Sequence, residues 1–149
     1  MTRLAGTATA GIARVAEAVI ELVLGFDFGI KRIGIAMGNT LTGQAQPLAV
    51  VNAIDNAARF KQIGDLIAAW APARLVVGEP RHPDGTEHEM TLRCRRFANQ
   101  LHGRFDLPVT LVDERYSSAV INAKRGQIID DQAASIILQQ YFDDHANNN

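Results

Sequence analysis

Acidic residues stand at three places in the chain where an unpaired carboxylate would destabilise a folded protein. They are Asp27 inside one apolar run, Asp113 and Glu114 at the end of a second, and Asp130 and Asp131 just before a third. A buried carboxylate without a partner is costly, so each acid needs a cation or hydrogen bonds. Carboxylates that gather at one point also repel one another unless a divalent cation neutralises them. The pattern therefore predicts a metal site assembled from three separate segments.

The residue types also indicate which metal such a site would hold. The chain has one cysteine, Cys94, and its four histidines share no metal-ligand spacing. Carboxylate ligands alone favour a hard, oxygen-binding cation, Mg²⁺ or Mn²⁺, over zinc. Mg²⁺ held by a few carboxylates and by substrate phosphate oxygens is the usual arrangement for phosphoryl chemistry. Phosphoryl chemistry is therefore the expected activity.

Two of the three places also have an ordinary structural interpretation. Acids at the start of a helix accept backbone N–H bonds and suit the helix dipole, which makes Asp130 and Asp131 candidate N-caps. Asp113, close to an arginine, would form a surface ion pair. The metal hypothesis is favoured because the acids come from three different elements, and it depends on the fold bringing those elements together.

The elements that would position these acids follow from the apolar periodicity. Residues 22–28 form a short apolar run closed by Gly29, and 33–38 alternate between apolar and small residues, as in a half-buried strand. A tight connection joins the two runs, which predicts an antiparallel hairpin. A third strand fits 47–51, with Pro47 tolerated at its first position.

Helical spacing alternates with short buried strands in the rest of the chain. One helix runs from Asp55 to a stop at Pro72, a second is capped by Thr86 or Thr91, and the last opens with Asp130 and Asp131. Their predicted buried residues are Phe60, Ile63, Leu66, Ile67 and Trp70 in the first, Met90, Cys94, Phe97 and Leu101 in the second, and Ala133, Ala134, Ile137, Leu138 and Tyr141 in the last. Short apolar runs at 75–77 and 109–112 fit buried strands between them.

This order of elements predicts an α/β fold with a mixed five-stranded sheet and helices on both faces. Three antiparallel strands come first and parallel strands follow. In such sheets, functional sites gather at the carboxyl ends of the parallel strands. Asp113 and Glu114 stand at that edge.

Length and composition indicate one domain with a short extension at each end. The chain has 149 residues, 47% of them hydrophobic, which suffices for one core. Residues 1–21 form a predicted N-terminal extension, with one helix indicated by Ile12, Val15, Val19 and Val23; 22–143 form the domain, and 144–149 a polar tail. An organelle transit peptide is the alternative for the acid-free first sixteen residues, but Glu17 and Glu21 disfavour it. No segment is long and apolar enough for a membrane span.

The basic residues do not mark the whole chain as a nucleic-acid-binding protein. Fifteen Lys and Arg stand against sixteen Asp and Glu, so any nucleic acid must meet a local patch. Candidates for phosphate contacts follow two of the acids closely or lie in a separate basic region: Lys31 and Arg32 after Asp27; Arg115, Ser117 and Ser118 after Glu114; and Thr86, Arg93 and Arg96 elsewhere in the chain. Arg95 and Arg104 belong to the same acid-free basic stretch. The alternatives are a solvated helix face for the arginines at 93–104 and simple turn charges at 31–32.

Five motifs, in the correct order from about residue 24 to 143, resemble the YqgF family. They are Gly25 to Ala36, Val77 to Pro80 with Asp84 to Glu87, Phe97 to Asn99, Asp113 to Ser118, and Asp130 with the Ala133-Ala134 and Ile137-Leu138-Gln139 runs. The family is described as Holliday-junction-resolvase-like and as a nuclease of pre-16S rRNA maturation in bacteria. The resemblance implies a ribonuclease H-like fold, in agreement with the element order.

The resemblance also implies the roles of the acids. Asp27, Glu114 and Asp130 would be the catalytic, metal-binding carboxylates, and Asp113 and Asp131 would be their neighbours. Two ions would work together, one making a hydroxide from water and the other stabilising the leaving 3′ oxygen. Asp27 would bridge the ions, and the expected products carry a 5′ phosphate and a 3′ hydroxyl.

The implied function is maturation of the 5′ end of pre-16S rRNA in the cytoplasm, by a monomer or homodimer acting on structured RNA or on pre-30S particles. Cleavage of four-way DNA junctions is the first alternative, and a non-catalytic ribosome-assembly factor is the second. The retained acids disfavour that factor, since an inactive site would be more stable without buried charge. An actin-like phosphotransferase is disfavoured because 149 residues leave no room for a second lobe.

Three features depart from the family pattern. Glu79 replaces a residue that is usually apolar in the Gly-x-Pro motif, which would add an acid close to the site. Residues 119–129 form a shorter segment than usual, which leaves the substrate geometry open. The extension before Leu22 has no counterpart in the family pattern.

Overall fold

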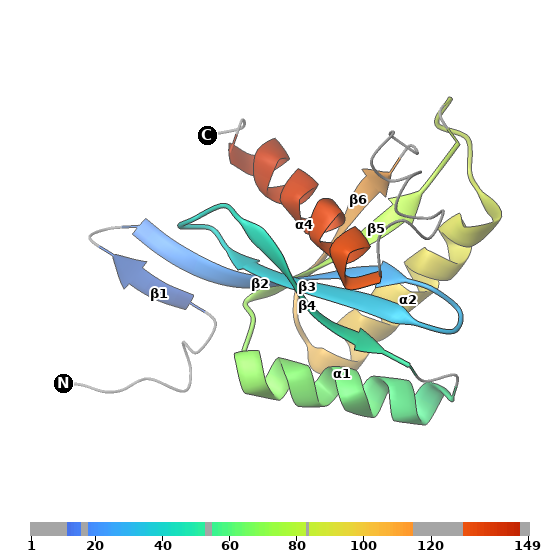
Figure 1. Cartoon of the computed structure of the whole chain (residues 1–149), viewed down its shortest axis with the longest axis horizontal. Helices are drawn as coiled ribbons and strands as arrows, with labels where there is room; N and C mark the ends of the chain where they lie inside the picture. The colour runs from blue at the N-terminus through green and yellow to red at the C-terminus, as the bar shows by residue number, and fades with distance from the viewer. Residues whose placement is uncertain (1–11, 16–17, 53–54, 83, 115–129, 147–149) are drawn as a thin grey trace.

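The computed structural model describes residues 12–15, 18–52, 55–82, 84–114 and 130–146 (Figure 1). Its elements, in chain order, are β1 (Ile12–Val15), β2 (Ala18–Phe28), β3 (Ile33–Asn39), β4 (Ala45–Val51), α1 (Asn56–Trp70), β5 (Arg74–Pro80), α2 (Glu89–Phe105), β6 (Val109–Glu114) and α4 (Asp130–Ala146). Each strand and helix of the predicted domain is present in this order.

The central sheet has the order β4-β3-β2-β5-β6. β4, β3 and β2 are antiparallel neighbours, whereas β5 and β6 run parallel to β2. Short turns produce the antiparallel part, and the crossovers through α1 and α2 produce the parallel part. The predicted mixed five-stranded sheet is confirmed, and its centre is β2, the strand that carries Asp27.

The sheet separates two cores, because successive side chains of a strand point to opposite faces. On one face, Leu24 and Phe26 of β2 pack with Val77 of β5 beneath α1 and α2. On the other face, Val23 of β2 packs with Val76 of β5 beneath α4. Figure 1 shows α4 on one side of the sheet and α1 on the other. The face on which a side chain lies can therefore be read from its position along the strand.

The N-terminal extension differs from its prediction. Instead of a helix, residues 12–15 form β1, which pairs antiparallel with the start of β2 from Ala18 to Glu21. The stretch is rich in β-branched residues, which favour a strand once a partner strand is available. β2 then continues without a break across the predicted domain boundary at residue 22. At the other end, α4 extends to Ala146, into the predicted tail. The division into extension, domain and tail stays a prediction.

The helix starts are decided by local hydrogen bonds. Asp55 caps α1 by accepting from the Ala58 N–H at 3.0 Å. The N-cap of α2 is His88, so the predicted cap at Thr86 or Thr91 is wrong. The His88 Nδ1 accepts from the Met90 N–H at 3.1 Å, and the Thr91 hydroxyl accepts from the His88 N–H at 2.7 Å. Histidine is not among the usual capping residues, which is why the sequence pattern missed it.

The predicted buried faces of the helices are largely confirmed. Ala133, Ala134, Ile137, Leu138 and Tyr141 are buried in α4, and Cys94, Phe97 and Leu101 are buried in α2. Phe60 and Ile63 are buried in α1, but Trp70 at its end is 38% exposed.

Candidate metal and nucleic-acid site

Asp27 is a buried carboxylate near the end of the central strand. It is 7% exposed and lies two residues after Gly25 on β2, on the face that α4 covers. The residues before and after it on the strand, Phe26 and Phe28, are apolar. The sequence predicted that a carboxylate buried at this position needs a cation or hydrogen bonds to offset the cost of burying its charge.

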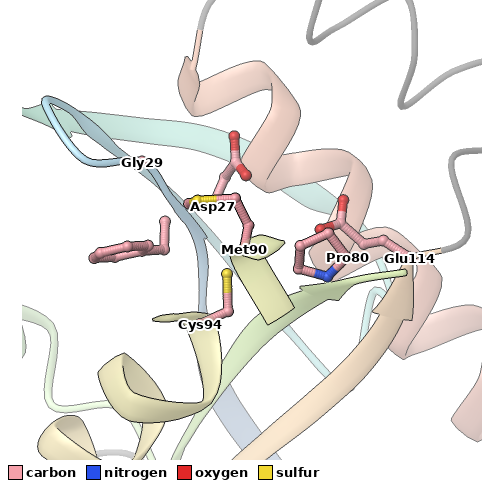
Figure 2. A pocket seen from close by; sticks show the side chains of 7 residues that line it. Asp27, Gly29, Pro80, Met90, Cys94 and Glu114 are labelled. Carbon is pink, nitrogen blue, oxygen red and sulfur yellow. The ribbon is translucent and has the colours of Figure 1, made fainter. Parts of the chain in front are cut away.

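Glu114 is the second buried carboxylate, at the last residue of β6. It is 3% exposed and lies two residues after Val112, whose side chain packs in the core beneath α4. Asp27 and Glu114 line one cavity of about 290 Å³ at the carboxyl ends of the strands. Figure 2 shows both carboxylates at this cavity. The structure thus brings together two of the three predicted metal-binding acids.

Gly78 supplies the space that Glu114 occupies. β5 lies between β2 and β6, so the strands that carry the two acids are roughly 10 Å apart. A Cβ atom at Gly78 would lie 2.6 Å from the Glu114 Oε1 and 2.7 Å from the Ile137 Cδ1. The Glu114 side chain therefore extends over β5, toward the strand of Asp27. Sequence reasoning missed this role, although a glycine inside a buried strand is a signal of close approach.

The first two turns of α4 reach the level of Asp27. A Cβ atom at Gly25 would meet Leu138 at 2.8 Å, and one at Gly38, the β3 partner of Val23, would meet Phe142 at 2.6 Å. α4 therefore runs antiparallel to β2. Two residues of a strand span about the same length as one turn of a helix. The next turn toward the helix start reaches the level of Asp27.

Asp130 is the first residue of α4, as predicted, and its side chain lies outside what the structure describes. Among the described side chains, no group of three His, Cys, Asp or Glu residues is arranged to hold a metal ion. The convergence of Asp27, Glu114 and Asp130 on one point therefore stays a prediction.

The described residues nevertheless fit a hard divalent cation. Asp27 and Glu114 offer only oxygen donors, which such cations prefer. Gly78 provides a space in which the Glu114 carboxylate lies over the neighbouring strand. One oxygen of Asp131, in the first turn of α4, is buried and has no hydrogen-bond partner. A buried oxygen without a donor is a favourable neighbour for a cation or its water ligands.

Glu79 does not join these acids, contrary to the expectation that it adds an acid near the site. It alternates with Gly78 on β5 and lies on the face that α2 covers. Its carboxylate binds Arg95 at 2.6 Å and Arg81 at 3.1 Å, and Arg95 also binds Glu87 at 2.9 Å. Hydrogen bonds to Glu79 and then to Glu87 raise the pKa of the Arg95 guanidinium. Glu79 is therefore paired with two cations, and its ion pair with Arg95 fastens α2 to the end of β5.

Basic side chains border the site at the turn between β2 and β3. Lys31 and Arg32 are exposed there, four and five residues after Asp27. Arg59 of α1 holds this turn, because its Nη2 donates to the Ile30 carbonyl at 2.9 Å. Its guanidinium also lies over the Phe28 ring, 5.5 Å from the centroid. Nothing local in the sequence indicated Arg59, since its contact depends on how α1 packs.

The other predicted nucleic-acid contacts have different surroundings. Arg93 and Arg96 are exposed on α2, whereas Arg104 lies over the Phe60 ring at 4.1 Å. Thr86 is exposed and donates to Asp84 from its N–H and its hydroxyl, and these bonds lower the pKa of the Asp84 carboxyl. Arg115, Ser117 and Ser118 lie outside the described residues, as does the shortened segment 119–129. Within the described part of the chain, no helix is both long enough and apolar enough to cross a membrane.

Known structures with this architecture include DNA junction resolvases. The fowlpox virus resolvase, determined with Holliday junction DNA, superposes with a TM-score of 0.53 at 10% identity, covering 83% of this chain and 97% of its own. Thermus thermophilus RuvC, determined with a Holliday junction substrate, gives a TM-score of 0.50 at 18% identity, covering 81% and 92%. At these identities the similarity concerns the fold alone, and it confirms the ribonuclease H-like fold.

Relatives with much higher identity carry a different description. A protein of Burkholderia ambifaria (strain MC40-6) named "Putative pre-16S rRNA nuclease" is 53% identical over 131 residues, covering 81% of this chain and 88% of the relative. A protein of Paraburkholderia xenovorans (strain LB400) with the same name is 55% identical over 127 residues, covering 81% and 87%. The model of the RuvX family, described as Holliday junction resolvase, matches residues 21–144. Together with the motifs from Gly25 to Gln139, these similarities show that the chain belongs to the RuvX (YqgF) family.

Proposed function

We propose that this protein is a divalent-metal-dependent nuclease that hydrolyses phosphodiester bonds of precursor rRNA at the 5′ end of 16S rRNA. The observation that carries the proposal is the pair of buried carboxylates, Asp27 and Glu114, in one cavity at the carboxyl ends of parallel strands. Burying two carboxylates costs free energy, and a metal-binding role would explain why the site retains them. The names of the relatives supply the substrate.

Asp27, Glu114 and Asp130 would hold two Mg²⁺ or Mn²⁺ ions. When bound, the ions supply Lewis-acid activation of the attacking water and stabilisation of the leaving 3′ oxygen. Residues of the chain position the carboxylates that would hold these ions. Gly78 leaves the space in which Glu114 reaches over β5, and the apolar strands keep both carboxylates away from bulk water. A low-dielectric environment strengthens the attraction between these carboxylates and a cation.

The nucleic acid would reach the acids past the basic turn between β2 and β3. Lys31 and Arg32 would bind backbone phosphates, and Arg59 holds the turn in place through the Ile30 carbonyl. Arg93, Arg96, Thr86, Arg115, Ser117 and Ser118 are further proposed contacts. The whole chain has a formal charge of −1, so a nucleic acid has to meet a local basic patch. Binding would thus be local, in the cytoplasm, to precursor rRNA or to pre-30S particles, by a monomer or homodimer.

Cleavage of four-way DNA junctions is the second candidate function. The description of the RuvX family and the fold shared with resolvases favour it. Paired cuts in a junction would require two copies of the active site, arranged with twofold symmetry. The oligomeric state and the substrate therefore have to be tested together.

The test compares cleavage of a 16S precursor RNA and of a four-way DNA junction in Mg²⁺. The variants are Asp27→Asn and Glu114→Gln, each nearly isosteric, and Asp113→Asn is the matched control because Asp113 is exposed beside Glu114. We expect the first two to lose at least about a hundredfold in rate, since each removes a ligand charge. Asp113→Asn should retain the wild-type rate. Wild-type cleavage by Asp27→Asn would contradict the role of the carboxylates, whereas absence of cleavage by the wild-type protein would favour the non-catalytic assembly factor.

A further inference from the structure

The cavity that contains the two acids has a second, apolar part. Beside Asp27 and Glu114 it is lined by Phe28, Gly29, Pro80, Met90 and Cys94. Figure 2 shows Met90 and Cys94 on α2 beside the cavity. A phosphate and its metal ions need only polar ligands, so the apolar wall has no role in the proposed hydrolysis. An apolar wall at this position would fit an apolar part of the ligand.

The apolar part of the cavity and the carboxylates lie at the same end of the sheet but on opposite faces of it. Asp27 is on the face beneath α4, and the next residue, Phe28, packs on the other face, with the core beneath α1 and α2. Met90 and Cys94 come from α2, on that same face. A ligand that fills the cavity would therefore contact the carboxylates on one face and the apolar wall on the other. A single nucleotide has this form, since its phosphate and its base are joined through a sugar.

The apolar wall is held in place by its own contacts. The Phe28 ring packs on Phe97 with centroids 4.8 Å apart. The Thr91 hydroxyl donates to the Pro80 carbonyl, which fastens the first turn of α2 to the end of β5. Cys94 is buried in the core. Preformed pockets bind with less loss of conformational entropy than pockets that form on binding.

We propose that this cavity receives the base of the nucleotide next to the scissile phosphate. Its volume of about 290 Å³ lies at the lower limit of pockets that hold drug-sized ligands, which suits a flat ligand of one or two rings. Side chains such as Met and Pro contact any base face, so the pocket would accept a base with little sequence preference. A base stacked within a duplex cannot enter such a pocket. The substrate would therefore present an unpaired nucleotide at the cleavage point, and the inference rests on the proposed nuclease function.

The first experiment uses an RNA whose cleaved bond has been mapped with the wild-type protein. The nucleotide on either side of that bond is replaced, one at a time, by an abasic nucleotide. Cleavage should fall roughly 10- to 100-fold at one of the two positions, as expected for loss of one base contact. Met90→Trp, which fills the cavity, should slow cleavage of the intact RNA by a similar factor and show no further loss on the abasic RNA. Leu92→Trp is the matched control, because Leu92 is 62% exposed on the same helix.

A second measurement does not depend on cleavage. 2-Aminopurine placed at the sensitive position reports unstacking through its fluorescence, in Ca²⁺ and under conditions where no product forms. Fluorescence should rise on binding to the wild-type protein and to Leu92→Trp, and should rise less with Met90→Trp. If Met90→Trp does not fold, Met90→Ala replaces it and should weaken the contact.

The outcomes separate this inference from the proposed function. If the wild-type protein cuts no RNA, the proposed cleavage of precursor rRNA fails, and the inference fails with it. If it cuts intact and abasic RNA at equal rates, the nuclease function stands and the base pocket is refuted. Equal fluorescence changes with the wild-type protein and Met90→Trp would refute it as well.

Discussion

Replacement of Gly78 by alanine tests the geometry of the acidic site most directly. The added Cβ atom would lie 2.6 Å from the Glu114 Oε1, 2.9 Å from its Cδ and 2.7 Å from the Ile137 Cδ1. Non-bonded heavy atoms normally stay about 3.5 Å apart or more, so the carboxylate must move by roughly 1 Å. Both neighbours are ends of flexible side chains. We therefore expect a stability loss of about 1 kcal/mol, at the lower end of overpacking effects.

The effect on metal binding should be larger than the effect on stability. Metal–oxygen distances tolerate changes of only about 0.2 Å, so a carboxylate displaced by roughly 1 Å is a poor ligand. Loss of an interaction that positions a ligand commonly weakens metal binding about 10- to 100-fold. We expect a loss of that size for Gly78→Ala, measured by titration with Mn²⁺ in a calorimeter, alongside a thermal melt without metal.

Gly38→Ala is the matched control for a packing defect away from the acids. Its Cβ atom would lie 2.5 Å from the Gln44 carbonyl oxygen and 2.6 Å from Phe142, near the opposite end of α4. The backbone oxygen yields less readily than a side chain, so this variant should be destabilised more than Gly78→Ala. Its Mn²⁺ affinity should equal that of the wild-type protein. Wild-type Mn²⁺ affinity in Gly78→Ala would refute the role assigned to Gly78.

Three further predictions concern other parts of the structure. The change Glu79→Leu should lower the free energy of unfolding by about 1–3 kcal/mol in urea titrations, because it removes the acceptor of Arg81 and Arg95, yet Mn²⁺ affinity should not change. Replacing Lys31 and Arg32 together by alanine should make the salt dependence of RNA affinity shallower by about 1.4 in log–log slope; an unchanged slope would exclude them as phosphate contacts. Burial raises the pKa of Tyr141 above its ordinary value of 10.0, so the unfolded chain releases this proton first as pH rises. Stability should therefore decline above pH 10 and decline less in Tyr141→Phe, as urea unfolding between pH 9 and 11 would show.

The sequence by itself determined the elements from residue 22 onward and the candidate acids. Period-two alternation in residues 33–38 and helical spacing from Phe60 to Ile67 are local properties, so they predicted strands and helices correctly. Asp27 could also be identified locally, because a carboxylate within an apolar strand is unusual in any fold. The connection lengths then predicted the antiparallel and parallel parts of the sheet.

Only the tertiary structure decided which face of the sheet each acid occupies and what lies beside it. Glu79 looked like an additional acid at the site, but one step along β5 places it on the opposite face, between Arg81 and Arg95. Gly78 gained its role because β6 lies next to β5 and directs Glu114 over it. Residues 12–15 formed a strand because β2 offered them an edge. Each of these outcomes depends on contacts between segments far apart in the chain, and local periodicity contains no information about such contacts.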